Sequence, residues 1–150
     1  IDYLTPDEYF QFVARISGTP DEEYQSFLAR FEHFMAGELM GQNKLIRNLS
    51  AGNKQKVGIV AAMLLRPKVL ILDEPFNFLD PSSQSAIKNL LLEYNRETGA
   101  TILVSSHNLQ HTVDISPRIA LLENGVIIRD IDNADGKAQE ELENYFKITD

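Results

Sequence analysis

The sequence contains no cysteine and no long uninterrupted hydrophobic run. Without cysteine, the chain can form neither a disulfide framework nor a thiolate metal site. Its longest apolar run, Ile59 to Leu65, is much shorter than the roughly 20 residues that a membrane-spanning helix needs. These absences argue against a disulfide-stabilised fold and against a membrane span in this sequence.

Basic residues are also scarce, since 14 Lys and Arg stand against 22 Asp and Glu and the net charge is −8. Binding to a phosphate backbone needs clustered cations, so we expect no nucleic-acid partner. A chain of 150 residues with 43% hydrophobic content is long enough for one domain with a real core and short for two.

Two helix-start signals lie near the N-terminus. Thr5-Pro6-Asp7-Glu8 has the form of a capping box with proline in the first turn, and Thr19-Pro20-Asp21-Glu22 repeats it. Apolar residues at three-and-four spacing predict the buried faces of two antiparallel helices. These are Tyr9, Phe12, Val13 and Ile16 in the first helix, and Tyr24, Phe27, Leu28, Phe31, Phe34 and Met35 in the second.

Two carboxylates, Asp73 and Glu74, directly follow the apolar run 69–72, which lies between Pro67 and Pro75. Such a run predicts a strand of a parallel sheet, buried on both faces. Ligands of open α/β sheets bind beyond the carboxyl ends of strands, so this acidic pair is a candidate for chemistry. The alternative is that these residues merely end the strand as a polar turn.

A helix is predicted on each side of this strand. Ser50 can cap the first, and Asp80, followed by Pro81, can cap the second. Their predicted buried stripes are Val57, Val60, Ala61 and Leu64 in the first, and Ile87, Leu90, Leu91 and Tyr94 in the second. Ser50 and Gly52 allow two interpretations: an ordinary capped helix, or an anion site at the positive end of the helix dipole.

A second apolar strand is predicted at 101–105, and Ser106-His107 follows it. A strand, helix and strand with a crossover of this length form a right-handed parallel unit, which would place His107 on the same sheet edge as Asp73 and Glu74. Beyond it, 118–131 reads as a hairpin around Asn124-Gly125. A terminal helix is expected from Lys137 to Phe146, packing Leu142, Tyr145 and Phe146.

Four motifs in this order resemble those of ATP-binding cassette (ABC) ATPases. Leu49 to Gln55 resembles the ABC signature, and Val69 to Glu74 resembles the Walker B strand. Asn77 to Asp80 resembles the D-loop, and His107 resembles the H-loop switch. Ala51 replaces a frequent glycine and Asn77-Phe78 varies the usual D-loop, but the order and spacing of the four motifs are highly specific.

The resemblance implies an α/β fold of the P-loop NTPase type, present as a partial domain with a helical subdomain and part of the parallel-sheet core. The implied division is a helical subdomain with the signature helix at 1–66, the second half of the ATPase core at 67–131 and a C-terminal helix at 132–150. No Gly-x-x-x-x-Gly-Lys-[Ser/Thr] phosphate loop occurs. We therefore expect a fragment of an ATPase that is inactive alone.

The resemblance also implies roles for the candidate site residues, with ATP and Mg²⁺ as cofactors. Asp73 would hold Mg²⁺ through water, Glu74 would polarise the water that attacks the γ-phosphate, and His107 would contact that phosphate. Ser50, Ala51, Gly52 and Gln55 would bind the nucleotide of a partner subunit in trans, and Asp80 would cross the dimer interface.

The function implied is the ATP-hydrolysing subunit of an ABC transporter. Its partners would be a second nucleotide-binding subunit and a transmembrane permease, the latter facing the helices at 5–36. The protein would then lie in the cytoplasm, peripheral on the inner face of the plasma membrane.

Three other functions compete with transport. A chromosome-maintenance or DNA-repair ATPase lobe has the same motif order, but it follows a long heptad coiled coil that is missing before Leu49. A ribosome-acting cassette protein would carry basic insertions, and none appears. The third is a non-catalytic helical interaction module whose acidic loops act only as caps.

Overall fold

A computed structural model describes the backbone of residues 1–134 and 138–149, with side chains up to Tyr145 in the last helix. The chain forms two compact units, Ile1–Leu103 and Val104–Asp150, each described by itself. The length of the chain favoured one domain, whereas the structure has two units. The reason is that the C-terminal hairpin and helices bury a small core of their own. This division follows packing, so it does not test the motif-based ranges 1–66, 67–131 and 132–150.

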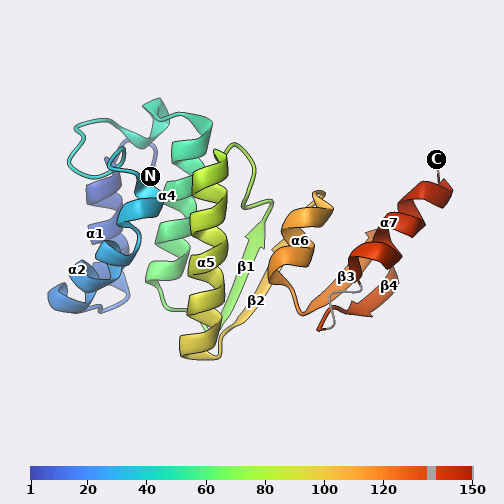
Figure 1. The fold of residues 1–150 in the computed structure, drawn as a ribbon. Coiled ribbons are helices and arrows are strands. Elements are labelled where there is room, and N and C mark those ends of the chain that lie inside the picture. The colour runs from blue at the N-terminus through green and yellow to red at the C-terminus, as the bar shows by residue number, and fades with distance from the viewer. Residues whose placement is uncertain (135–137, 150) are drawn as a thin grey trace. The chain divides into compact units, whose positions relative to one another are not determined.

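The first unit is mostly helical and ends in two strands (Figure 1). In chain order its elements are α1 (Pro6–Ile16), α2 (Asp21–Arg30), α3 (Glu32–Met35), the 3₁₀ turn η1 (Ile46–Asn48), α4 (Ala51–Leu64), β1 (Val69–Asp73), α5 (Pro81–Thr98) and β2 (Thr101–Ser105), whose last residues belong to the second unit.

Helix α1 begins at the predicted capping box. The Thr5 hydroxyl accepts a hydrogen bond from the Glu8 N–H at 3.3 Å, and the Glu8 carboxylate accepts one from the Thr5 N–H at 2.8 Å. The predicted buried face is partly wrong, because Phe10 is fully buried while Phe12 is 52% exposed and Ile16 is 64% exposed. Helix α1 has two overlapping apolar faces that share Val13. The face that contains Phe10 is the buried one, because it packs against α4.

The second predicted helix is divided at Phe31 into α2 and α3. Its predicted cap is also wrong: Pro20 occupies the cap position without a side-chain hydrogen bond, and the Thr19 hydroxyl instead lies 2.7 Å from that of Ser17. Phe31 and Phe34 are nevertheless buried, as expected. The apolar spacing thus predicted the burial of these two residues but missed the break between α2 and α3.

Strands β1 and β2 are neighbours joined through α5, and their arrows run in the same direction in Figure 1. The prediction that the first strand is buried on both faces is wrong. Leu70 and Leu72 are buried, whereas Val69 is 59% exposed and Ile71 is 67% exposed. The reason is that helices α1 to α5 lie on one side of the two strands, and no described segment of the first unit covers the other side.

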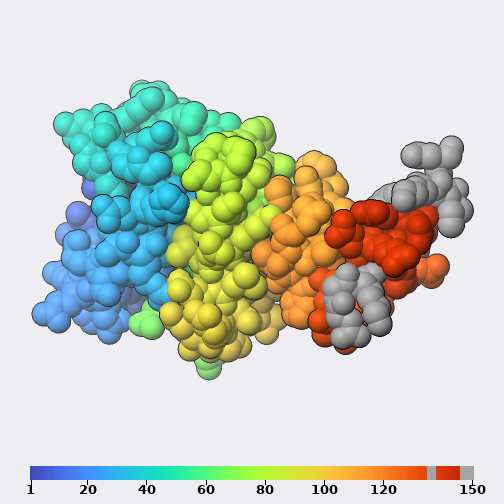
Figure 2. Space-filling view, viewed as in Figure 1, coloured from blue at the N-terminus to red at the C-terminus, as the bar shows by residue number. Residues whose placement is uncertain are grey.

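Helix α5 follows its sequence signals closely. Asp80 is its N-cap, Pro81 is its first residue, and Gly99 ends it in the left-handed conformation with φ of 66°. The predicted stripe Ile87, Leu90, Leu91 and Tyr94 is buried. Figure 2 shows α2 and α5 meeting at the surface, where Arg30 pairs with Glu93 at 3.6 Å and with Glu97 at 2.9 Å.

The second unit contains α6 (Leu109–Ile115), β3 (Arg118–Glu123), β4 (Val126–Asp132) and α7 (Ala138–Thr149). Strands β3 and β4 are antiparallel, and the predicted Asn124-Gly125 turn joins them with both residues at positive φ. Their small core consists of Ile119, Ile131, Ala138 and Leu142. The predicted terminal helix is present, with Lys137 and the side chain of Phe146 outside the described residues.

Candidate functional site

The N-terminus of α4 carries the residues that resemble the ABC signature. The Ser50 hydroxyl accepts a hydrogen bond from the Asn53 N–H at 3.2 Å, which confirms Ser50 as the N-cap. Ala51 and Gly52 follow in the first turn of this 14-residue helix. First-turn N–H groups, a hydroxyl and the positive end of a helix dipole form a donor set that fits a phosphate group.

Gln55 joins this helix to the acidic pair. Its side-chain amide donates a hydrogen bond to the backbone carbonyl of Glu74 at 3.1 Å. Glu74 has a positive φ of 47°, so the chain turns sharply there as it leaves β1. The structure therefore brings the α4 N-terminal segment and the residues after β1 into direct contact within one unit.

Residues 74–80, which we call the acidic loop, are held by several hydrogen bonds. The Asn77 N–H donates to the Glu74 carbonyl at 3.2 Å. The Phe76 carbonyl accepts from the Gln84 side chain at 3.2 Å and from the Leu79 N–H at 3.4 Å. The Phe76 ring is buried, and Phe78, at φ of 63°, is 74% exposed. The loop is thus anchored at its centre and unusually strained at Phe78.

Asp80 closes the acidic loop and is the N-cap of α5. Its carboxylate accepts hydrogen bonds from the Ser83 hydroxyl and from the Ser83 N–H, the latter at 3.0 Å. The Lys56 ammonium lies 4.0 Å from the same carboxylate. These contacts lower the pKa of Asp80 below its ordinary 3.8. The hydrogen bond from the Ser83 hydroxyl has the largest effect, the one from the Ser83 N–H comes next, and the charge of Lys56 adds to both.

We expect the Asp80 carboxyl to titrate below pH 3.8 in an NMR titration of its side-chain carbon. Because the folded-state pKa is lowered, the stability that this group contributes is present above its ordinary pKa and is lost as pH falls below 3.8 through the folded value. A Ser83→Ala variant removes the largest cause, so the midpoint should move upward. An unchanged midpoint in that variant would contradict the assigned cause.

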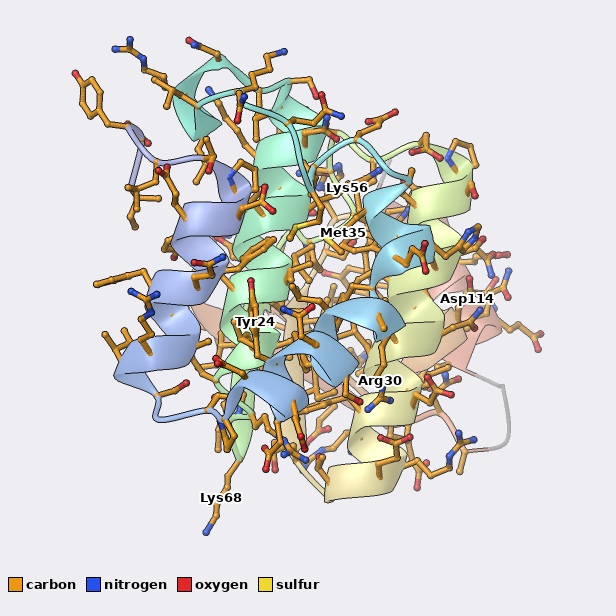
Figure 3. All side chains as sticks on the ribbon, turned by 90° about the vertical axis from the view of Figure 1, so that its left-hand side faces the viewer. Tyr24, Arg30, Met35, Lys56, Lys68 and Asp114 are labelled. Carbon is orange, nitrogen blue, oxygen red and sulfur yellow. The ribbon has the colours of Figure 1, made fainter. Side chains whose placement is uncertain are left out.

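Lys56 is a site residue that the sequence reasoning missed. It is only 4% exposed, and its ammonium lies 5.8 Å from the centre of the Phe34 ring as well as near Asp80. Figure 3 shows Lys56 beside Met35 in the interior between α4 and α3. The available signal was a lysine four residues before Val60, on the predicted buried stripe of its helix. A buried cation there anchors the end of the acidic loop to α4.

Asp73 and Glu74 supply carboxylate oxygens, the ligand type that Mg²⁺ prefers together with water and phosphate. Among residues 1–134 and 138–149, no group of three or more His, Asp or Glu side chains could hold a metal by itself. Two carboxylates with phosphate and water nevertheless fit magnesium chemistry. His107 follows β2 in the second unit, so its predicted position at the edge with Asp73 and Glu74 stays a prediction.

Comparison with known proteins gives consistent results. A protein-family profile described as "AAA domain, putative AbiEii toxin, Type IV TA system" matches residues 17–114. The methionine import ATP-binding protein MetN of Carboxydothermus hydrogenoformans is 34% identical over 119 residues, covering 79% of this chain and 35% of that protein.

Two solved structures share the fold. The structure of an ATP binding subunit of an ABC transporter is 29% identical, has a TM-score of 0.82, and is matched over 100% of this chain and 64% of its own. A dimeric bacterial ABC transporter cassette is 23% identical with a TM-score of 0.72, over 89% of this chain and 58% of its own, which supports the fold alone.

Fold and family profile together define a partial α/β domain of the P-loop NTPase type. Within that class, the chain belongs to the ABC nucleotide-binding domain family, as its motifs indicated. It spans about a third of the length of the MetN relative. No helix in the described parts of the chain is both long and apolar enough to cross a membrane.

Proposed function

We propose that this chain carries the signature, Walker B, D-loop and H-loop segments, with the helical subdomain, of an ATP-hydrolysing subunit of an ABC transporter. The observation that carries the proposal is the hydrogen bond from Gln55 to the Glu74 carbonyl at 3.1 Å, which joins the signature helix to the acidic pair. The relatives support the same function, because the MetN relative is named as an ATP-binding protein for methionine import.

In this proposal Glu74 would polarise the water that attacks the terminal phosphate, and Asp73 would hold Mg²⁺ through a water molecule. The bound metal would supply positive charge to the phosphate oxygens as they gain negative charge. Glu74 lies in a turn anchored to α4 by Gln55, so its backbone position is set before any ligand arrives. His107 would contact the γ-phosphate.

The α4 N-terminus is proposed to act on the nucleotide of a second subunit. Ser50 is exposed and caps the helix, so its hydroxyl and the adjacent N–H groups lie at the surface of the unit. Ala51, Gly52 and Gln55 belong to the same trans site, and Asp80 would lie in the dimer interface. The cassette whose fold this chain shares is dimeric, and that pairing motivates this part of the proposal.

The permease is proposed to contact the helical segment 5–36, which would place the protein at the inner face of the plasma membrane. The chromosome-maintenance alternative requires a long coiled coil before the signature, whereas the observed helices there, α1 and α2, have 11 and 10 residues. The acidic balance of the chain likewise supports a role without nucleic acid.

Calorimetry with Mg-ATP tests the proposal, on this chain and on a longer protein in which a phosphate-binding loop precedes it. A phosphate loop supplies several charge-assisted hydrogen bonds of about 1.5–3 kcal/mol each, so binding to this chain alone should be weaker by several powers of ten. We expect binding and turnover only in the longer protein. Tight binding by this chain alone, or no turnover in the longer one, would contradict the proposal.

A further inference from the structure

Gly52 is in contact with the acidic loop of its own chain. A Cβ atom added at Gly52 would stand 2.5 Å from the backbone oxygen of Phe78 and 3.5 Å from its carbonyl carbon. Real Cβ atoms do not approach backbone oxygen so closely, and a backbone atom cannot swing aside as a long side chain can. The acidic loop therefore occupies the space that any side chain at position 52 would need.

The Phe78 carbonyl is aimed at Gly52 by an unusual backbone conformation. Phe78 has φ of 63° and its side chain is 74% exposed, so neither burial of the ring nor intrinsic preference explains this conformation. Surrounding contacts must hold it there: the Phe76 carbonyl is bonded to Gln84, and Asp80 is tied to Ser83 and Lys56. Strain kept by such anchors is typical of functional loops.

We propose that Gly52 is a positioning residue. Because it has no side chain, it leaves room for the Phe78 carbonyl against α4 and so sets the conformation of the acidic loop. The glycine then serves its own chain in addition to any nucleotide of a partner. A side chain at position 52 would displace Phe78 and, through it, Glu74 and Asp80 at the two ends of the loop. The catalytic consequence rests on the proposed function, whereas the contact between Gly52 and the Phe78 carbonyl does not.

Helix α4 offers a matched control. Gly58 lies in the same helix, and a Cβ there would meet nothing within 4 Å. Alanine favours a helix interior over glycine, so Gly58→Ala should raise the melting temperature by a few degrees. Gly52→Ala gains the same propensity but meets the Phe78 carbonyl, so we expect its melting temperature to fall by about 5 °C or more.

The test measures both variants of this chain by thermal unfolding and by NMR of the backbone amides. Amide resonances of 76–80 should shift in Gly52→Ala and stay in place in Gly58→Ala. Phe78→Gly lets the loop take another path, so the double variant Gly52→Ala with Phe78→Gly should recover most of the lost melting temperature. If Gly52→Ala alone does not fold, folding of the double variant would itself be the rescue that supports the inference.

Three results would overturn the inference: Gly52→Ala as stable as Gly58→Ala, unshifted loop resonances, or no rescue by Phe78→Gly. In the longer protein with a phosphate loop, Gly52→Ala should lower kcat, and Phe78→Gly should restore part of it. A longer protein without ATPase activity would refute the proposed function. The unfolding and NMR results would still test whether Gly52 positions the acidic loop.

Discussion

Replacing Glu74, the proposed general base, by glutamine should lower ATP turnover by about 10²–10⁴-fold in a longer protein that carries a phosphate loop, because a general base contributes about this much to the rate. The amide keeps the size of the side chain and leaves the backbone carbonyl free to accept the Gln55 hydrogen bond. Stability and ATP binding should therefore change little. Steady-state turnover, compared with nucleotide affinity measured by calorimetry, separates the two effects.

The matched control is Glu22→Gln, the same change at an exposed position of α2. It removes one negative charge without touching the acidic loop, so turnover should remain near that of the parent. Unchanged turnover in Glu74→Gln would favour the non-catalytic module, in which the acidic loop only caps structure. Equal losses in both variants would point to net charge as the cause.

Truncating Phe10 to alanine should destabilise the first unit by about 3–5 kcal/mol, the usual cost of removing a fully buried aromatic ring. Phe10 is 0% exposed, on the face of α1 that packs against α4. A domain is stable by only about 5–15 kcal/mol, so this loss is a large part of the total. Denaturant unfolding followed by circular dichroism measures it.

Phe12→Ala is the control for that prediction, because it removes the same ring two residues along the same helix. Phe12 is 52% exposed, so its removal should cost less than about 1 kcal/mol. The sequence pattern assigns Phe12 to the core, so the two variants also decide between the two stripes of α1. A larger loss in Phe12→Ala than in Phe10→Ala would contradict the observed packing of α1.

The signals that worked from sequence were local ones. Ser50 and Asp80 were predicted as N-caps and are N-caps, since a cap depends only on a side chain and on N–H groups three residues away. The Asn124-Gly125 turn was predicted for the same kind of reason, because both residues tolerate positive φ. The resemblance to ABC ATPases also rests on short motifs and their order, and the comparisons confirmed that family.

The features that sequence missed are contacts between distant segments. The burial of Lys56, the choice of Phe10 over Phe12 and the exposure of Ile71 depend on which elements pack together. Periodicity proposes a face for a helix or strand, but only a neighbouring element determines whether that face is covered.

Sequence alone therefore determined the caps of α1, α4 and α5, the Asn124-Gly125 turn, the order of the motifs and the ABC family of this chain. Tertiary structure decided how those motifs meet: Gln55 on the carbonyl of Glu74, Lys56 beside Asp80, and the Phe78 carbonyl against Gly52. Each of these contacts joins α4, which precedes β1 in the chain, to the acidic loop, which follows it. No local propensity encodes such a contact, because its free energy arises only when both segments are already in place.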